Sequence, residues 1–543
     1  MENTTNFRIR RLDKDQADQV IEYEPYIDKY LCKIKPYYFN YKAFCKERWR
    51  DKKLVDIFTK EFRDRPAEYY VDVISKGGVV VNGKPSTIDT IVRNGDMIIH
   101  KVHRHEPPVT SKSIKVVYQD DDLMVIDKPS GIPVHPTGRY RYNTVTKIIE
   151  RQFDGLVVHP CNRLDTLTSG LMMLAKTRKG ADKLADQLQN REVEKMYIAQ
   201  VIGEFPAGKE ITVDQPLKTI DRKVSLNAVA LDRNDPFAKE SKTIFRRISY
   251  NGKTSIVQCC PLTGRTHQIR VHLQYLGFPI ANDPIYSNKD VWGESLGKGG
   301  LNDFDEVISK LDILGKTSSL GSWMYPHIKE QDVVQLTFSR CPDCDVEIPP
   351  DPKEHELELW LHAYCYQSKG SLKKDGSWSY KTEFPGWALL PHTQYMELGL
   401  QQAKECPPTT TAFSVGAVLV HDSNILEVGY SRELPSNTHA EQCAMEKYFT
   451  KIGKRELPLG TVLYTTMEPC SFRLSGNKPC VDRIIKMGNS IETIFVGVIE
   501  PDTFVKKNDG KNQLENAGIN YVHIPGYEEK CIEAATKGHD NIA

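Results

Sequence analysis

The sequence predicts a multidomain chain of α+β and α/β type, in which a mixed sheet is followed by a three-layer α/β/α domain. Its 543 residues are enough for two to four domains with buried cores. Strand-like runs dominate the stretch that begins at Ser113, and helical and strand-like segments alternate after Pro391. The expected divisions are an N-terminal extension at 1–50, a small module at 51–108, a larger domain at 109–385 and a C-terminal domain at 386–543.

Composition indicates the cellular compartment but does not indicate which kind of molecule the chain binds. Lys and Arg number 73 and Asp and Glu 72, so a net charge of +1 neither favours nor excludes a polyanion. The thirteen cysteines are scattered and odd in number, which is typical of free or metal-bound thiols in a reducing compartment. No apolar run reaches transmembrane length, and the first fifteen residues carry acids and lack an amphipathic arginine face. We therefore expect a cytoplasmic protein without a membrane partner.

Residues 51–108 have the pattern of a compact module. Leu54, Val55, Ile57 and Phe58 predict an amphipathic helix, and V-V-V-N-G-K-P predicts a strand that meets an Asn-Gly turn. The order resembles a small RNA-binding module first described in a ribosomal small-subunit protein. Its basic side chains could meet phosphates, the alternative being a solvated charged face: Lys76, Lys84, Arg93, Lys101 and Arg104.

From Ser113 onward the pattern becomes rich in strands. We expect strand, acidic turn and strand up to Lys128, then R-L-D at 163–165 ahead of a glycine and an apolar strand. A helix and the strand V-E-K-M-Y-I-A-Q-V-I-G follow, and P-L-T-G-R-T-H-Q-I-R begins at residue 261. Taken singly, each motif is usually a turn or a basic loop. Together, over about residues 110–385, they resemble the RluA-type RNA pseudouridine synthases.

The resemblance implies a role for particular residues. Asp165 would be the catalytic carboxylate that attacks the uridine, and Arg163 would help to displace the target base. Tyr197 would pack on that base, and Arg270 would pair with Asp165, since a buried carboxylate needs a cation to stay ionised. Asn162 stands where the family usually has histidine, which leaves the choice of RNA target open.

Residues 286–340 predict an inserted, exposed segment, and Cys341 and Cys344 follow it as C-P-D-C. A C-x-x-C pair favours zinc or redox chemistry, but two ligands do not close a structural zinc site. Cys365 is a possible third ligand, and two ordinary thiols are the favoured interpretation. Residues 366–389 are expected to finish the sheet and to become a linker near Pro385.

The C-terminal part carries a histidine, an acid and two cysteines in a distinctive order. T-H-A-E-Q-C contains His439 and Glu441, and Cys470 and Cys480 each follow a proline. Three ligands leave the fourth zinc position for water, and Glu441 could shuttle protons to and from that water. The alternative is two reduced thiols and a hydrogen-bonded histidine.

The pattern H-x-E…P-C-x-x-C is the signature of zinc nucleobase deaminases, although here nine residues separate the cysteines. Y-T-T-M-E-P-C-S, R-L-S-G-N-K-P-C-V-D-R-I-I and V-G-V-I-E-P-D, within about residues 390–540, resemble the fungal pyrimidine deaminases of riboflavin biosynthesis. The resemblance implies one zinc ion and hydrolytic deamination of a diamino-(ribitylamino)-pyrimidinone 5′-phosphate. In this cytidine-deaminase-like domain Arg473 and Lys478 are candidates for the phosphate and Asn437 for the ring or sugar, the alternative being solvated loop residues.

The main hypothesis is a bifunctional enzyme, acting on uridine in RNA, with tRNA as the expected class, and on a small pyrimidine nucleotide. One alternative is an RNA or nucleoside deaminase fed by the N-terminal RNA-binding region. The other is a synthase-like region that no longer catalyses and only holds RNA. Homo-oligomerisation through the C-terminal domain is a further expectation.

Overall fold

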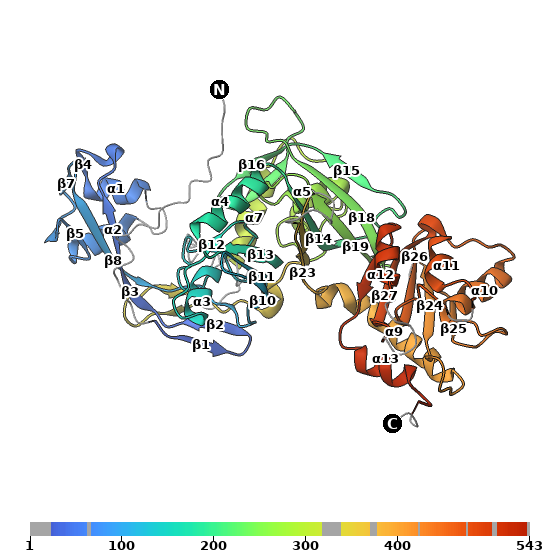
Figure 1. Cartoon of the computed structure of the whole chain (residues 1–543). Helices are drawn as coiled ribbons and strands as arrows, with labels where there is room; N and C mark the ends of the chain where they lie inside the picture. The colour runs from blue at the N-terminus through green and yellow to red at the C-terminus, as the bar shows by residue number, and fades with distance from the viewer. Residues whose placement is uncertain are drawn as a thin grey trace. The chain divides into compact units, whose positions relative to one another are not determined.

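The computed structural model describes residues 23–61, 67–317, 338–369, 377–421, 424–473, 476–501 and 508–539. The chain forms two compact units. Figure 1 labels most of their helices and strands. The first unit takes the chain up to Ile114 together with Pro129–Leu167 and Ile308–Glu358, and the second takes Lys115–Lys128, Thr168–Val307 and Leu359 onward. Within the described residues, no helix combines the length and apolar character needed to cross a membrane.

A small sheet with two helices lies in the first unit. Its strand order is β3 (Tyr37–Phe44), β8 (Met97–Arg104), β5 (Val79–Val81) and β6 (Lys84–Pro85). The helices α1 (Leu54–Glu61) and α2 (Ala67–Ser75) contribute Leu54, Ile57 and Tyr70 to one buried core. The predicted helix and Asn-Gly turn are confirmed, with Asn82 and Gly83 both at positive φ. Strand β3 precedes residue 50, so the predicted extension contributes to this sheet.

The rest of the first unit consists of short elements. They are β1 (Pro25–Asp28), β2 (Leu31–Ile34), η2 (Glu47–Trp49), β4 (Lys52–Lys53), β7 (Ile91–Val92), β9 (Val109–Thr110), α3 (Val145–Gln152), β12 (His159–Pro160), β20 (Ser339–Arg340), β21 (Glu347–Ile348) and η4 (Glu354–Leu357). Glu106 fixes one loop, because its buried carboxylate accepts hydrogen bonds from the Tyr37 hydroxyl and from the N–H groups of Arg141, Tyr142 and Asn143. Such multiple pairing offsets the cost of burying the charge.

The second unit contains a large sheet, here called the central sheet, in the order β10-β11-β13-β22-β14-β19-β18-β15, with β23 beside β22. The strands are β10 (Lys115–Gln119), β11 (Leu123–Lys128), β13 (Ser169–Ala175), β14 (Val193–Ile202), β15 (Ile211–Asp214), β18 (Lys242–Tyr250), β19 (Thr254–Pro261), β22 (Leu361–Ser368) and β23 (Ser379–Lys381). The hairpin β16 (Leu217–Asp221) and β17 (Leu226–Val229) and the helices α4 (Arg178–Gln189), α5 (Gln268–Leu276) and α6 (Lys289–Trp292) accompany it, and the division between the two units falls within α7 (Asp305–Thr317). The strands and the helix predicted between residues 114 and 203 are confirmed.

Strand β22 comes late in the chain but lies in the middle of the central sheet, parallel to β13 and antiparallel to β14. Gly170 makes this possible. Its φ of 108° favours glycine, and a β-carbon there would collide with the backbone of Ala363 on β22. The glycine that follows R-L-D is therefore required for the close approach of two strands.

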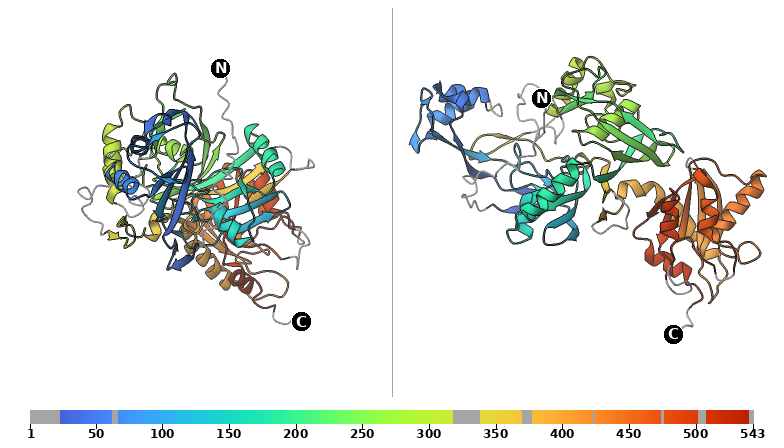
Figure 2. Two further views of the ribbon diagram at one scale, coloured as in Figure 1. Left: turned by 90° about the vertical axis from the view of Figure 1, so that its left-hand side faces the viewer. Right: turned by 45° about the horizontal axis from the view of Figure 1, so that its top comes forward.

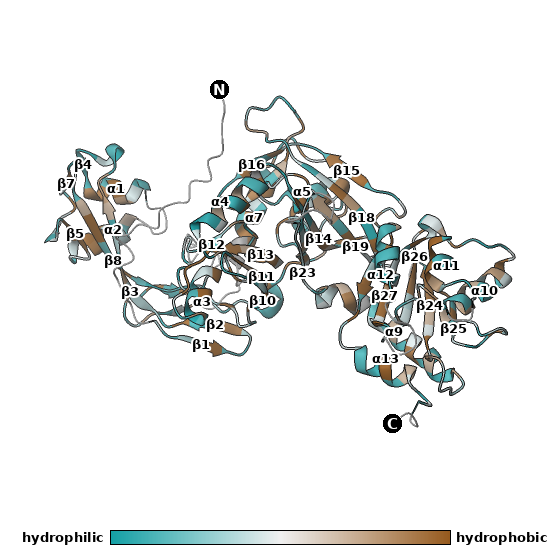
Figure 3. Ribbon diagram, in the orientation of Figure 1, coloured by the Kyte–Doolittle hydropathy of each residue, from teal (hydrophilic) through white to brown (hydrophobic). Residues whose placement is uncertain are grey.

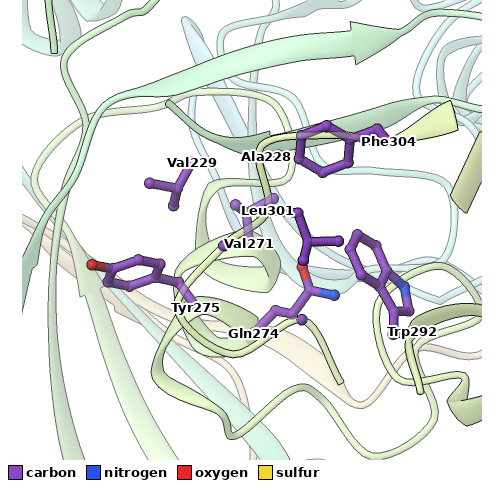
Figure 4. A pocket seen from close by; sticks show the side chains of 10 residues that line it. Ala228, Val229, Val271, Gln274, Tyr275, Trp292, Leu301 and Phe304 are labelled. Carbon is purple, nitrogen blue, oxygen red and sulfur yellow. The ribbon is translucent and has the colours of Figure 1, made fainter. Parts of the chain in front are cut away.

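Residues 286–304 correct one expectation, since they are not an exposed insertion. Tyr286 is fully buried, and its hydroxyl accepts a hydrogen bond from the N–H of Asn227. Trp292 and Phe304 line a small pocket together with residues of α5 (Figure 4). The segment was predicted to be exposed because its hydrophobic residues are separated by glycines, a pattern typical of loops. Residues 318–337 of the predicted insertion lie outside the described residues.

The C-terminal domain begins at α9 (Gly386–Glu405) and is built on the sheet β25-β24-β26-β27-β28. Its strands are β24 (Gly416–His421), β25 (Asn424–Tyr430), β26 (Thr461–Met467), β27 (Ile491–Val498) and β28 (Asn520–His523). Its other helices are α10 (Ala440–Ile452), α11 (Cys480–Ile485), η5 (Gly488–Ser490), α12 (Gly510–Asn516) and α13 (Glu528–Ala535).

Helices cover both faces of this sheet (Figure 2). Met396 of α9 and Cys531 of α13 share one core, whereas α10, α11 and α12 contribute to a second core on the other face. Figure 3 shows hydrophobic residues concentrated on the strands, with hydrophilic residues on the outer sides of the helices. The predicted three-layer α/β/α arrangement is confirmed.

The central sheet and the C-terminal domain pack directly against each other. Ile198 and Ile248 of the sheet belong to the same core as Trp387 of α9. The Thr493 hydroxyl donates to the Ile248 carbonyl over 3.1 Å, and Ser249 Oγ lies 3.1 Å from His392 Nε2. The linker expected near Pro385 is therefore short, because Pro385 is already the N-cap of α9.

Candidate active sites

Three side chains that could bind a metal converge at the edge of the C-terminal sheet. His439 is the N-cap of α10, Cys470 follows β26, and Cys480 is the first residue of α11. Their ligand atoms all lie within 4.8 Å of one another. We call these three residues the three-ligand cluster.

The distances within the three-ligand cluster suit tetrahedral zinc. His439 Nδ1 lies 3.4 Å from the sulfur of Cys470 and 3.4 Å from that of Cys480. Zinc bonds of about 2.3 Å to sulfur and 2.0–2.1 Å to nitrogen at a tetrahedral angle place N and S about 3.6 Å apart. The long spacer between the cysteines does not prevent this, because the Val481 N–H donates to the Cys470 carbonyl over 3.2 Å and ties the two ends of the loop together.

Backbone packing sets the start of α10. A β-carbon on Gly429 of β25 would come within 2.5 Å of the Ala440 carbonyl oxygen, so only glycine lets the helix approach the strand so closely. His439 has extended backbone angles and Glu441 lies in the first turn. Cys480 also begins a helix, and the partial positive charge of a helix N-terminus stabilises a thiolate.

Glu441 lies directly beside the three-ligand cluster. Its side chain is 3% exposed, and it accepts hydrogen bonds from the Thr465 hydroxyl over 3.2 Å and from the Cys480 thiol over 3.3 Å. Burial raises the pKa of the Glu441 carboxyl above its usual value. A carboxyl that holds a proton more tightly than usual, fixed beside an open metal position, is suited to proton transfer.

The pKa values of the two thiols in the three-ligand cluster are shifted in opposite directions. The hydrogen bond with Cys480 lowers the pKa of Cys470 to about 4, and the imidazole of His439 adds to this effect. The same hydrogen bond, together with burial, raises the pKa of Cys480. Without a cation the pair therefore holds one proton, and a divalent ion would displace it and neutralise both sulfurs. The donor set fits zinc.

The predicted substrate-binding residues occupy different settings. Arg473 is 6% exposed, and its guanidinium donates to the Asn437 carbonyl over 2.5 Å and to the Gln442 side chain over 3.3 Å. It thus fastens the loop after Cys470 to the start of α10. Lys478 and the side chain of Asn437 are exposed.

Two further carboxyl groups near Cys470 were not predicted from the sequence. Glu468 comes directly after β26, and Glu500 lies two residues after the end of β27. The two strands are parallel neighbours, so both residues lie at the same edge of the sheet. Burial, with Cys470 and Glu468 nearby, raises the pKa of Glu500 to about 8. The Asn508 side chain donates to Glu500 over 2.8 Å and to the Pro469 carbonyl over 3.2 Å. The repeated E-P after each strand, at 468–469 and 500–501, was the available signal.

The residues predicted for the synthase chemistry fall in both units. Asp165 and Arg163 lie in a loop of the first unit, where Asp165 is partly buried and Arg163 is exposed. Tyr197 lies on β14, and its hydroxyl is 2.7 Å from that of Tyr366 on β22. Arg270 lies on α5 of the second unit, so its pairing with Asp165 stays a prediction.

Arg270 has a partner that the sequence did not reveal. Its guanidinium donates to both oxygens of Asp283, over 2.6 and 2.9 Å, and both side chains are buried. Asp283 also accepts from the N–H groups of Ile285 and Tyr286, over 2.9 and 3.0 Å. A bidentate pair of this kind fixes the plane of the guanidinium. Asp283 thus positions the side chain of Arg270. A single aspartate in N-D-P did not indicate this role in the sequence.

The basic residues predicted for the small module differ in what they contact. Arg104 is buried, and it donates to the carbonyls of Gly138 and Arg139 over 3.3 and 2.7 Å. Its role in the first unit is therefore structural. The Lys101 ammonium lies over the Tyr38 ring at 4.7 Å, and phosphate contacts of the exposed cations stay a prediction.

Comparisons with known proteins agree with both halves of this description. The chain matches the RNA pseudouridylate synthases over residues 122–275, and the cytidine and deoxycytidylate deaminase zinc-binding region over residues 390–498. The Saccharomyces cerevisiae protein named tRNA pseudouridine(32) synthase, mitochondrial, is 59% identical over 372 residues, which are 68% of this chain and 79% of that protein. The human pseudouridylate synthase RPUSD2 is 45% identical over 67% of this chain and 74% of its own length.

Two further relatives match the C-terminal part. The Schizosaccharomyces pombe diaminohydroxyphosphoribosylamino-pyrimidine deaminase is 45% identical over 148 residues, 27% of this chain and 36% of that protein. The structure of Aspergillus oryzae Rib2 deaminase is 38% identical with a TM-score of 0.26, and the match covers 28% of this chain and 94% of that one.

The chain belongs to the RNA pseudouridine synthase family, and its C-terminal part is a domain of the zinc-binding cytidine and deoxycytidylate deaminase type. It is therefore a bifunctional enzyme that joins an isomerase to a hydrolase.

Proposed function

We propose that the C-terminal domain deaminates 2,5-diamino-6-(ribitylamino)pyrimidin-4(3H)-one 5′-phosphate in riboflavin biosynthesis, and that the rest of the chain converts uridine to pseudouridine in tRNA. The names of the Schizosaccharomyces pombe and Saccharomyces cerevisiae relatives support the two substrates. The observation that carries the deaminase half is the buried carboxyl of Glu441 beside three converging metal ligands.

His439, Cys470 and Cys480 would hold one zinc ion. When bound at three protein ligands, zinc acts as a Lewis acid that brings the pKa of water toward neutrality. The chain's own contribution is to fix these ligands on two helix starts and one strand end, so that little rearrangement is needed on binding.

Glu441 performs the proton transfers. Its carboxylate accepts a proton from the attacking water while a C–O bond forms at the ring carbon that carries the amine. The carboxyl then donates that proton to the departing nitrogen, the C–N bond breaks, and ammonia leaves. The Thr465 hydroxyl bond orients the carboxylate, and the burial that raises the pKa of Glu441 keeps the proton available for the second step.

We assign the substrate phosphate to Arg473 and Lys478, and the ring or sugar to Asn437. The Arg473 guanidinium holds the Asn437 carbonyl, so the two residues would act as one unit. Lys478 is exposed and can meet a doubly charged phosphate without a large desolvation cost.

For the synthase half we assign nucleophilic attack to Asp165, and we place Arg163 against the displaced base. Tyr197 supplies a ring on which an extruded uracil can stack, and the Tyr366 hydroxyl holds that ring in place. Arg270 would stabilise the charge of Asp165, with its guanidinium plane fixed by Asp283.

We also propose the boundaries 1–50, 51–108, 109–385 and 386–543 as the functional divisions of the chain, with RNA-binding in the second. A cytoplasmic location and an oligomer formed through the deaminase domain stay predictions. The Saccharomyces cerevisiae relative is named as a mitochondrial protein, so the location of this chain has to be measured.

The deaminase assignment is tested by measuring ammonia release from the full chain with three substrates: the diaminopyrimidine phosphate, cytidine and tRNA. We expect release from the first alone, and the control variant Glu441→Gln should slow it by about 10²- to 10⁴-fold. Release from tRNA alone would contradict the assignment and favour an RNA deaminase.

The synthase assignment is tested with Asp165→Ala. This variant should form no pseudouridine in tRNA and should deaminate the pyrimidine phosphate as well as the unaltered chain does. Pseudouridine formation by Asp165→Ala would show that the nucleophile has been placed wrongly. An unaltered chain that binds tRNA but forms no pseudouridine would mean that this region only holds RNA.

A further inference from the structure

A second group of potential metal ligands lies in the first unit, far in sequence from the three-ligand cluster. It consists of His103, His105, Cys341 and Cys344, and their ligand atoms all lie within 4.8 Å of one another. We call these residues the four-ligand cluster. Neither proposed activity uses any of them.

We propose that the four-ligand cluster is a structural zinc site. It offers two imidazoles and two thiols, a donor set that closes a tetrahedral coordination sphere without water. His105 Nε2 lies 3.3 Å from Cys344 Sγ, and His103 Nδ1 lies 3.6 Å from Cys341 Sγ. Ligands of one tetrahedral zinc are expected to have N and S about 3.6 Å apart.

The two cysteines are presented by a tight turn. Strands β20 and β21 pair as a hairpin, with Cys341 and Cys344 in the connection. The Cys341 N–H donates to the Val346 carbonyl over 3.0 Å, and the Asp345 N–H donates to the Cys341 carbonyl over 2.9 Å. Asp345 takes a φ of 53°, which reverses the chain just after the second cysteine. The turn thereby holds both sulfurs close to the same histidines.

The two histidines come from the end of β8 and the residue beyond it. Residues two apart in an extended chain point to the same side, so H-x-H directs both rings toward one point. Their ring planes stand at 88° with centroids 4.9 Å apart. One ring presents its Nδ1 to Cys341 and the other its Nε2 to Cys344.

The burial of these side chains favours metal coordination over simple contacts between thiols and imidazoles. His105 and Cys341 are 8% and 4% exposed, and the side chain of His103 is 6% exposed. Cys365, the third ligand considered from the sequence, does not belong to the cluster; it lies on β22, and its sulfur is 3.9 Å from Ser379 Oγ.

The consequence of such a site would be a cross-link within the first unit. His103 and Cys341 are separated by 238 positions in the chain, and His105 and Cys344 by 239. A zinc ion there would fasten the β20–β21 hairpin to the end of β8. Structural zinc stabilises folds mainly by joining segments that lack a large core of their own, as is the case for this hairpin of two-residue strands.

The test is the zinc content of the full-length protein, measured by elemental analysis against protein concentration. We expect two zinc ions per chain. The double variant Cys341→Ser/Cys344→Ser should contain one and should still deaminate, whereas the matched control Cys365→Ser should contain two. One zinc in the unaltered chain, or two in the double variant, would overturn the proposal.

A second measurement covers the case in which the double variant does not fold. The Cys480→Ser chain, which lacks a ligand of the other cluster, is loaded with cobalt in place of zinc. We expect the absorption bands of tetrahedral cobalt bound by thiolates, and their loss when His105→Ala is added. Absence of these bands, or a Cys341–Cys344 disulfide in protein purified under reducing conditions, would also overturn the proposal.

Discussion

The two cysteine and histidine clusters use the same donor atoms but differ in number and surroundings. The three-ligand cluster lies at helix starts and a strand end, with the buried carboxyl of Glu441 in contact with Cys480. The four-ligand cluster lies on a hairpin and a strand end, and Asp343 beside it is 66% exposed, with an oxygen 3.9 Å from His103 Nε2.

The difference in ligand number shows how the same metal could serve catalysis at one site and structural stability at the other. Three protein ligands leave a position where water can bind, and a buried acid beside that position can move protons. Four ligands fill the coordination sphere, so the ion can only hold segments together. The chemistry of each cluster therefore follows from the number of ligands and the burial of the neighbouring acid.

The largest expected difference is between Cys480→Ser and Cys344→Ser. Cys480→Ser should lower deamination by more than about a thousandfold, because a Lewis acid supplies several kcal/mol of barrier reduction and each 1.4 kcal/mol is tenfold. Cys344→Ser should leave deamination within about twofold. Comparable losses in both variants, measured as kcat with the pyrimidine phosphate, would erase the functional distinction between the clusters.

Next in size is the effect of the acid beside each cluster. Glu441→Gln should lower kcat by about 10² to 10⁴, the usual contribution of a general acid–base, without reducing the zinc content. Asp343→Asn is the matched change beside the four-ligand cluster and should alter neither zinc content nor deamination. A Glu441→Gln enzyme with full activity would remove this residue from the mechanism.

A smaller effect is expected for Thr465→Val, which keeps the shape but removes the hydroxyl that donates to Glu441. The hydroxyl has one proton, which it shares between Glu441 and the nearer Met467 carbonyl at 2.8 Å. The bond to the carboxylate therefore contributes about 0.5–1.5 kcal/mol, and kcat should fall by roughly 2- to 10-fold. Thr450→Val, an exposed change on α10, is the control and should have no effect. If Thr465→Val changes only KM, the hydroxyl orients substrate and not the carboxylate.

The last expectation concerns the order of two losses when a chelator acts slowly on the full chain. The open position of the three-ligand cluster gives the chelator access, so deamination should disappear first. Backbone amides of the β20–β21 hairpin should lose protection from hydrogen exchange only later, when the four-ligand cluster is stripped. Loss of hairpin protection before loss of deamination would reverse the assignment of the open and closed sites.

Local patterns were sufficient for the C-terminal domain and for several strands and helices of the synthase region. The alternation of helix and strand after Pro391 predicted the α/β/α domain, and the H-x-E and two P-C pairs predicted the ligands that come together there. These signals survive in the sequence because each depends on short spacings: a period of two or 3.6 residues, or a ligand at the first position of a helix.

Pairings between distant segments could not be predicted in the same way. The C-P-D-C motif gives no indication of which other residues could share a metal with it, and His103 and His105 lie far away in the sequence. Asp283 likewise became visible as the partner of Arg270 only through the fold. Residues 286–304 were misjudged for a similar reason, since glycine-rich sequence suggests an exposed loop whereas Tyr286 and Trp292 pack into a core.

By itself the sequence determined the fold class, many of the helices and strands and the chemical nature of the donor side chains, because these properties depend on residues that are close along the chain. Only the tertiary structure decided which donors meet, how many share one point and which acid is buried beside them. The physical reason is that coordination and burial depend on distances in space, and folding sets those distances between residues that the chain keeps far apart.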